Sequence, residues 1–186
     1  MEFIIAHWMP ILASAAAVWV ASAIAWMAIN HHADDMKSLT PDAESKLSNL
    51  VKAHNIAPGV YGYPDFKKCK GQSPEERKAA MKEPMGILRV WKPINMSRPM
   101  ILSFLFYIFI GVLIAYLGTA AGIPAVGPFS HAFRVFGTAG VLAHACGGVV
   151  CNMWFQESRR AMILNFVDGV VYGLITGAVF AALWSK

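Results

Sequence analysis

Charge is scarce in this sequence outside one segment. Of its 186 residues, 15 % are charged and 56 % are hydrophobic, whereas ordinary soluble domains have about 25 % charged and roughly 45–50 % apolar residues. Eight of the eleven acidic residues and twelve of the sixteen Lys and Arg residues lie between positions 30 and 99. The basic excess therefore belongs to that segment, and without a nucleic-acid-binding motif it does not indicate a nucleic-acid partner.

Cysteine and common catalytic motifs are also lacking. Cys69, Cys146 and Cys151 form no CxxC pair, which disfavours a zinc ribbon or a redox disulfide. No Ser-His-Asp order, Walker loop, HExxH or GxGxxG occurs, so no reaction is named by a motif. We therefore favour a non-enzymatic protein, and no specific motif indicates a cofactor.

Long apolar runs dominate what is present. They cover residues 10–29, 100–118, 132–155 and 161–184, and about 20 apolar residues cross a ~30 Å hydrocarbon core. The first run follows Glu2 without a preceding Lys or Arg, so we expect a retained helix and not a signal peptide. The sequence predicts an all-α membrane protein with four transmembrane helices, the last two forming a hairpin because their connection is short.

The distribution of Lys and Arg predicts the orientation. Residues 30–99 carry twelve and residues 156–160 carry two, whereas the opposite side has only Arg134 and Lys186. By the positive-inside rule, both termini lie outside, in the periplasm, and the long segment lies in the cytoplasm of an inner-membrane protein. The expected organisation is transmembrane helix 1 in residues 1–30, a cytoplasmic segment in residues 31–98, and helices 2–4 in residues 99–186.

The cytoplasmic segment has a mixed, mostly helical pattern. Thr40 before a proline predicts an N-cap and a helix to about residue 54. Ser73 and Glu76 form a capping box that predicts a second short helix. Residues 55–70 are expected to be extended, and residues 86–91 either form a short strand or lie along the membrane surface.

Small residues recur every four positions on two of the expected helices. Such faces let helix backbones approach closely, and on the last helix they have the form of a glycine zipper. The spacing predicts close packing, either within the chain or with other membrane subunits or a second copy, in addition to contact with the lipid bilayer. The residues concerned are Ala13, Ala17, Ala21 and Ala25 on the first helix, and Gly169, Gly173 and Gly177 on the last.

A polar stripe runs beside these glycines. Asn165, Asp168 and Tyr172 are spaced for one helix face, and the helical rise puts Asp168 about 10 Å past the preceding turn. An acid at that depth suggests a function. Folding the hairpin brings His144 within a turn of it. One hypothesis makes the two residues a proton or ion relay, and the other makes Asp168 a hydrogen-bonded interior acid.

Two groups of residues resemble metal ligands. His7 lies at one expected membrane edge, and His31, His32, Asp34 and Asp35 lie at the other. Such residues also collect at membrane interfaces, and adjacent residues on a helix point in different directions. A metal site needs ligands that converge from different elements at about 2.0–2.2 Å, so metal binding stays open.

We expect an accessory or assembly subunit of a larger inner-membrane complex of respiratory or photosynthetic type. The grounds are the small-residue faces, the aromatic second helix, the ordered-looking cytoplasmic segment and the missing catalytic motifs. One alternative is a small homo-oligomeric transporter, coupled to protons or ions through Asp168. A further alternative is a membrane redox protein or enzyme that uses His144.

Overall fold

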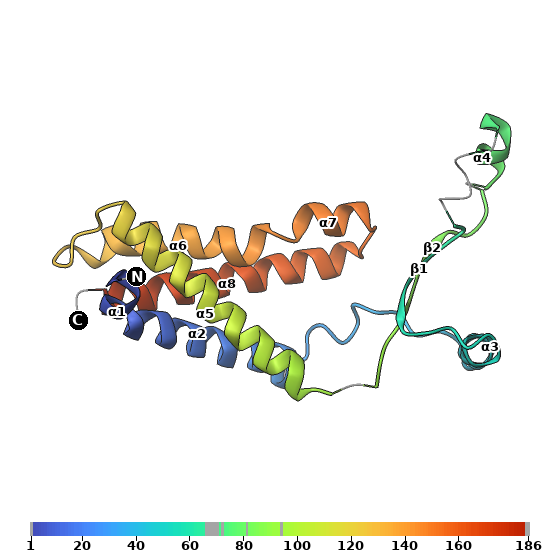
Figure 1. Cartoon of the computed structure of the whole chain (residues 1–186), viewed down its shortest axis with the longest axis horizontal. Coiled ribbons are helices and arrows are strands. Elements are labelled where there is room, and N and C mark those ends of the chain that lie inside the picture. Colours follow the sequence, from blue (N-terminus) through green and yellow to red (C-terminus); the bar gives the residue numbers. More distant parts are fainter. Residues whose placement is uncertain (1, 66–70, 72, 81, 94, 185–186) are drawn as a thin grey trace. The chain divides into compact units, whose positions relative to one another are not determined.

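The computed structural model describes residues 2–65, 71, 73–80, 82–93 and 95–184, and Figure 1 labels its helices and strands. Cys69, named above among the cysteines, and Lys186, used above for the orientation, lie outside the described residues. The chain divides into two compact units, one made of Met1–Lys37 and Met96–Lys186 and the other of Ser38–Asn95. The first unit contains the apolar helices, and the second is the connecting segment.

Four helices of the first unit are long and apolar enough to cross a membrane. They cover Trp8–Ile29, Ser97–Ala120, Phe129–Trp154 and Arg159–Leu183. This confirms the prediction of a multi-pass membrane protein, with ends only a few residues from those expected. The elements are α1 (Glu2–Ala6), α2 (Trp8–Ala23), the π-helix η1 (Ile24–Ile29), α5 (Ser97–Ala120), α6 (Phe129–Val141), the π-helix η3 (Leu142–Cys146), α7 (Val149–Trp154) and α8 (Arg159–Leu183).

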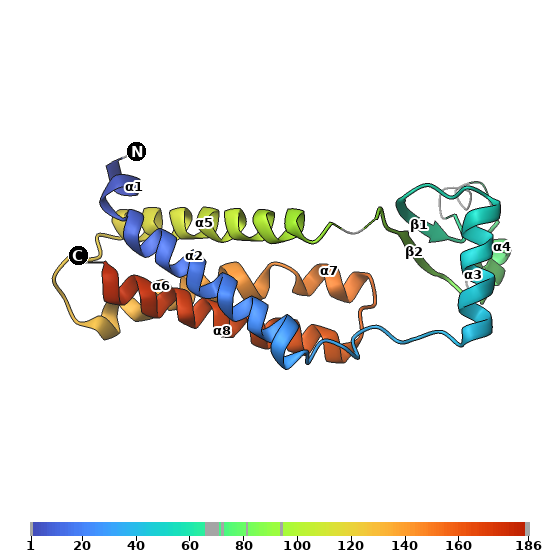
Figure 2. The ribbon, with the colours of Figure 1, turned by 90° about the horizontal axis from the view of Figure 1, so that it is seen from below.

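The third span is not the single uninterrupted helix that its hydrophobicity suggests. The α-helix α6 ends at Val141, and the π-helix η3 follows it. A second α-helix, α7, begins after Gly147 and Gly148. The break between α6 and α7 is visible in Figure 2. Two consecutive glycines weaken a helix because they have the greatest backbone freedom to lose. Hydropathy alone does not register this interruption.

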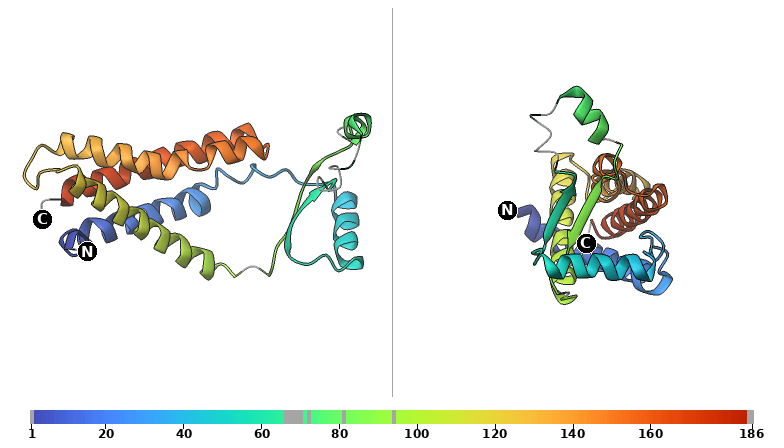
Figure 3. Two further views of the ribbon diagram at one scale, coloured as in Figure 1. Left: turned by 45° about the horizontal axis from the view of Figure 1, so that its top comes forward. Right: turned by 90° about the vertical axis from the view of Figure 1, so that its right-hand side faces the viewer.

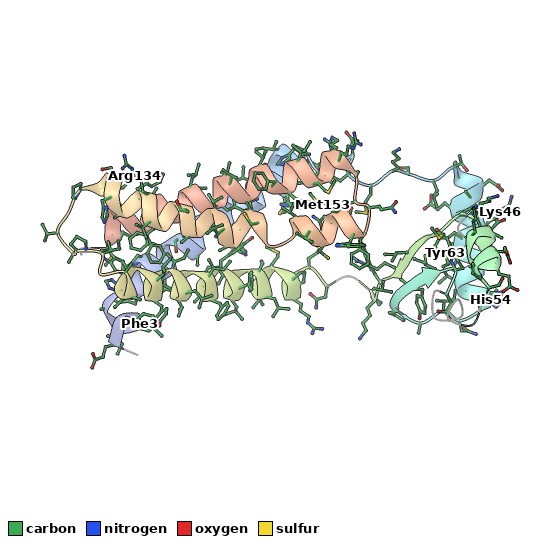
Figure 4. The ribbon with its side chains drawn as sticks, turned by 90° about the horizontal axis from the view of Figure 1, so that it is seen from above. Phe3, Lys46, His54, Tyr63, Arg134 and Met153 are labelled. Atoms are coloured by element: carbon green, nitrogen blue, oxygen red, sulfur yellow. The ribbon has the colours of Figure 1, made fainter. Side chains whose placement is uncertain are left out.

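The spans form a bundle in which α8 is central. It packs along α6 and η3 on one side and along α2 on another, and α2 also packs against α5, as two views in Figure 3 show. The start of α2 and the end of α8 lie at the same end of the bundle in Figure 1. Phe3 and Arg134 mark that end in Figure 4, and Met153 lies toward the other.

The glycine face of α8 is occupied within the chain. A β-carbon built on Gly169 would lie 2.6 Å from the Cα of Ala145, and one built on Gly140 of α6 would lie 2.6 Å from the carbonyl oxygen of Gly173. A β-carbon on Gly177 would collide with the backbone of Gly137. Because these contacts are with backbone, the two helices touch at their main chains. The small-residue spacing of α8 is therefore used against its hairpin partner.

The alanines of the first span are packed less tightly than the face beside them. Ala13, Ala17 and Ala21 are half-buried, and only Ala25 of that set is buried. The buried face of α2 instead combines one alanine, Ala15, with larger or polar residues at helical spacing, namely Ile11, Ser14 and Val18. Contact between α2 and its neighbours thus relies more on side-chain packing than on a stripe of alanines.

An apolar core fills the bundle near the end of α8. Phe136 of α6 and Phe180 of α8 are both 0 % exposed, and their ring centroids lie 5.3 Å apart. The Trp184 indole Nε1 donates to the carbonyl oxygen of Ile123 at 3.0 Å, which satisfies its polar atom in an apolar setting.

The connecting segment has the helices that its capping residues predict. The Thr40 hydroxyl accepts from the backbone N–H of Ala43 at 3.4 Å. The Ser73 N–H donates to the Glu76 carboxylate at 2.8 Å, and the Glu76 N–H donates to the Ser73 hydroxyl at 3.2 Å, so the capping box is confirmed. These caps begin α3 (Pro41–Ala53) and α4 (Pro74–Ala80).

A two-stranded antiparallel sheet completes the connecting segment. Strands β1 (Gly59–Tyr63) and β2 (Gly86–Val90) pair antiparallel, with Val60 opposite Arg89. Of the two possibilities left open for residues 86–91, the strand is the one found. The extended stretch predicted after the first helix supplies its partner.

Ser158 is the N-cap of α8, and its replacement tests how much this cap contributes to stability. Its hydroxyl accepts from the backbone N–H of Ala161 at 3.1 Å. We expect Ser158→Ala to lower the free energy of unfolding by about 1 kcal/mol, measured by SDS unfolding in mixed micelles. Ser158→Thr keeps a capping hydroxyl and should lose less. Equal losses in the two variants would contradict a capping role.

Candidate functional site

A cavity of about 410 Å³ lies among the four spans. The stripe predicted from helical spacing faces it, since Asn165, Asp168 and Tyr172 of α8 all line its wall. Polar side chains also come from α5, η3 and α7, including Ser103, Tyr107, His144 and Asn152. A polar cavity between apolar helices is a position where ions or polar ligands bind in membrane proteins.

Asp168 is the acid of this cavity, and two histidines contact it. The Nε2 atom of His31 lies 3.2 Å from each carboxylate oxygen, and the Nε2 atom of His32 lies 3.0 Å from Oδ2. The Tyr172 hydroxyl donates to Oδ2 at 3.5 Å. The Asp168 side chain is only 15 % exposed. Polar groups thus surround the carboxylate where burial would otherwise be costly.

The chain reaches Asp168 by turning back at the end of the first span. The π-helix η1 ends at Asn30, whose φ of 50° is left-handed, a conformation that stops helices and that Asn tolerates. The next residues form a turn, with the Ala33 N–H bonded to the Asn30 carbonyl at 3.1 Å. His31 and His32 are therefore not consecutive helical residues, and their ring centroids lie 4.4 Å apart. The argument that adjacent residues diverge does not apply to them.

A second layer of contacts holds His32 in place. Its Nδ1 atom lies 2.5 Å from an oxygen of Asp35, and its ring stacks on Trp26 with centroids 3.9 Å apart. Arg160 donates from Nη1 to the other oxygen of Asp35 at 2.6 Å and from Nη2 to the His31 carbonyl at 2.7 Å. Arg160 therefore links the start of α8 to the turn that carries both histidines.

The cluster has an excess of negative charge when its histidines are neutral. Asp35 and Asp168 are two carboxylates, and Arg160 is the one guanidinium in contact with Asp35. Burial lowers the pKa of His32, but its hydrogen bonds and charge interactions with Asp35 and Asp168 outweigh burial and raise the pKa above its usual value. Both ring nitrogens of His32 face carboxylate oxygens. The arrangement therefore favours one additional positive charge.

His144 lies on the same cavity but pairs differently from the sequence-based prediction. Its Nε2 atom lies 3.3 Å from the Thr176 hydroxyl, and its ring packs edge-on to Tyr172 with centroids 6.3 Å apart. Tyr172 thus contacts both His144 and Asp168. The hairpin register was close to that expected, but the histidines that contact Asp168 are His31 and His32, in the turn that follows the first span.

The remaining metal-ligand candidates lie outside this cluster. Asp34 is exposed, as is Ala33 before it, whereas Asp35 after it is partly buried. His7 stacks on Trp184 with ring centroids 3.7 Å apart, and burial lowers its pKa. Cys146 and Cys151 are exposed free thiols. The cluster therefore selects His31, His32 and Asp168 as possible ligands, with Asp35 behind His32.

Replacing Arg160 tests whether it fixes the histidine turn. We expect Arg160→Gln to speed amide hydrogen exchange in residues 31–35 by at least about tenfold, because hydrogen bonds to charged groups contribute roughly 1.5–3 kcal/mol and 1.4 kcal/mol is a factor of ten. Hydrogen-exchange mass spectrometry measures this directly. The matched control is Arg159→Gln, at the neighbouring exposed arginine. Unchanged exchange in the Arg160 variant would show that other contacts hold the turn.

The site offers two imidazoles and a carboxylate to a cation, next to a cavity that polar groups line. One nitrogen or oxygen ligand atom from each of these three residues lies within 4.8 Å of the others, a spacing that could hold a metal ion. Comparison with known proteins found no match, either to a family model, to a curated protein or to a solved structure.

Proposed function

We propose that this protein is a small ion carrier that binds its cation at Asp168. The observation that carries the proposal is the position of this carboxylate in the wall of a cavity of about 410 Å³ lined by all four spans. With neutral histidines, the adjoining cluster has two carboxylates to one guanidinium. A cation entering the cavity is therefore attracted to a largely buried carboxylate, where charge interactions are stronger than in bulk water.

The backbone beside the cavity also supports a carrier. Residues of both π-helices, Trp26 of η1 and His144 of η3, line it, and so does Gly148 at the break in the third span. π-Helical turns occur often at functional sites, and interrupted spans beside a binding site are a recurring feature of secondary transporters. Both features interrupt the α-helical hydrogen bonding beside the cavity, where a carrier must change shape.

The orientation that we propose is the one that the positive-inside rule gives. Both termini lie in the periplasm and the connecting segment lies in the cytoplasm of an inner-membrane protein, because Lys and Arg are concentrated in residues 30–99. The placement of α1 and the end of α8 at one end of the bundle agrees with both termini sharing a side (Figure 1).

Uptake by reconstituted vesicles tests the carrier. Purified protein in proteoliposomes should accumulate at least one cation from a panel of Na⁺, K⁺, Mg²⁺, Mn²⁺ and Zn²⁺ above protein-free vesicles, measured by elemental mass spectrometry of washed vesicles. Uptake should saturate with cation concentration, because it depends on a binding site. If no cation in the panel enters faster than into protein-free vesicles, the proposed function is wrong.

The accessory subunit expected from the sequence stays a prediction. One of its grounds, the glycine face of α8, contacts α6 and η3 of the same chain, so that face supplies no argument for a partner. Native mass spectrometry after detergent extraction separates the two ideas. Different subunits bound at fixed stoichiometry would favour the accessory role, and a monomer or symmetric oligomer would favour the carrier.

A further inference from the structure

We propose that His31, His32 and Asp168 form a binding site for a transition-metal dication of the Zn²⁺ type. The inference deepens the proposed function by naming the class of cation that it carries, and only the transport part rests on that function. The binding site itself stands on the geometry of three side chains from two elements far apart in the sequence.

The ligand atoms are already close to a metal-binding arrangement. One atom from each of the three residues lies within 4.8 Å of the others. Two ligands that are each ~2.1 Å from a tetrahedral ion lie about 3.4 Å apart, and the observed nitrogen-to-oxygen separations are 3.2 Å for His31 and 3.0 Å for His32. These two separations are within a few tenths of an ångström of the tetrahedral distance, and the ligand nitrogens of the two histidines lie within 4.8 Å of each other.

The donor set selects the class of metal. Imidazole nitrogen with carboxylate oxygen suits Zn²⁺, Fe²⁺ and their neighbours in the first transition row, whereas Mg²⁺ and Ca²⁺ prefer all-oxygen sites. Three protein ligands leave a fourth position for water or another exchangeable group, as in zinc sites that do more than support a fold. Of the three ligands, Asp168 also lines the cavity, which connects the site to that space.

The contacts behind His32 are those that a metal-binding histidine needs. A histidine ligand usually donates its other ring N–H to a carboxylate or a carbonyl, which fixes the tautomer. Asp35 takes this place at Nδ1 of His32, and Arg160 holds Asp35 from the other side. In the tautomer that carries its proton on Nδ1, His32 donates to Asp35, and the lone pair of Nε2 then points toward Asp168. Trp26 stacked on the ring restricts its rotation.

Equilibrium dialysis of the full chain tests the site. Detergent-purified protein stripped with EDTA should bind one Zn²⁺ per chain, and Mg²⁺ should not compete. His31→Ala and Asp168→Asn should weaken binding by at least ~100-fold, and Asp35→Asn, which removes an outer partner, by about 10–100-fold. His54→Ala and Asp34→Asn, at exposed residues, are the matched controls and should bind normally.

A measurement on the unmodified protein keeps the test decisive if a variant fails to fold. X-ray absorption at the zinc edge should show nitrogen and oxygen ligands with imidazole scattering. Sulfur ligands, absence of stoichiometric Zn²⁺, or unchanged binding in both folded ligand variants would overturn the site. Zn²⁺ binding without uptake would support the metal site and contradict the proposed carrier function. Uptake of another cation without Zn²⁺ binding would contradict the metal site and support the proposed carrier function.

Discussion

Asp168→Asn should abolish cation uptake by proteoliposomes and leave the protein folded. Asparagine matches the shape of aspartate, but its amide is neutral and presents one oxygen in place of two. The cation then loses the one carboxylate that the described residues place in the cavity wall. We expect uptake to fall to the rate of protein-free vesicles, a loss of at least ~100-fold, because direct ligands matter more than the outer partners that contribute about 10–100-fold.

The same substitution should have little effect on stability. Without the charge of Asp168, one carboxylate of Asp35 faces one guanidinium of Arg160, and the cost of burying a second carboxylate disappears. Asp34→Asn, which neutralises an exposed acid nearby, is the control for both measurements. If the free energy of unfolding of the Asp168 variant instead fell by ~3–5 kcal/mol, Asp168 would belong to a buried ion pair with a structural role. If the variant is folded and its uptake is normal, Asp168 does not take part in transport.

Gly173→Ala should be the most destabilising single-methyl change in the bundle. A β-carbon at this position would collide with the backbone N–H and Cα of Val141 and the backbone of Gly140. Backbone atoms cannot change rotamer, so α6 and α8 would have to separate along their shared face. We expect a loss of about 3 kcal/mol or more, the upper end for overpacked cores, measured by SDS or thermal unfolding in detergent.

Gly147→Ala is the matched control for that variant. Gly147 lies in the same hairpin with right-handed helical φ and ψ, and a β-carbon there would meet nothing within 4 Å. Alanine should therefore be neutral or stabilising by about 0.4–1 kcal/mol, because it reduces the freedom of the unfolded chain. Equal effects of the two substitutions, or a fully stable Gly173 variant, would show that α6 and α8 do not touch at their backbones.

Sequence alone determined the features that depend on local composition. Four spans follow from runs of apolar residues, since burial in hydrocarbon requires only length and hydrophobicity. The two helices of the connecting segment follow from Thr40 and from the pair Ser73 and Glu76, because a cap acts within one helical turn. The polar stripe of α8 and its glycine face follow from helical periodicity, and both lie where that periodicity predicts.

Only the tertiary structure decided which groups surround Asp168. Depth along the hairpin pointed to His144, but depth does not reveal which histidine turns toward the acid. His31 and His32 reach it because the chain turns back at Asn30 and Arg160 holds the turn to the start of α8. That reversal depends on contacts between residues more than a hundred positions apart, which neither hydropathy nor helical spacing encodes. The cation site therefore emerges from the fold, although every ligand was visible in the sequence.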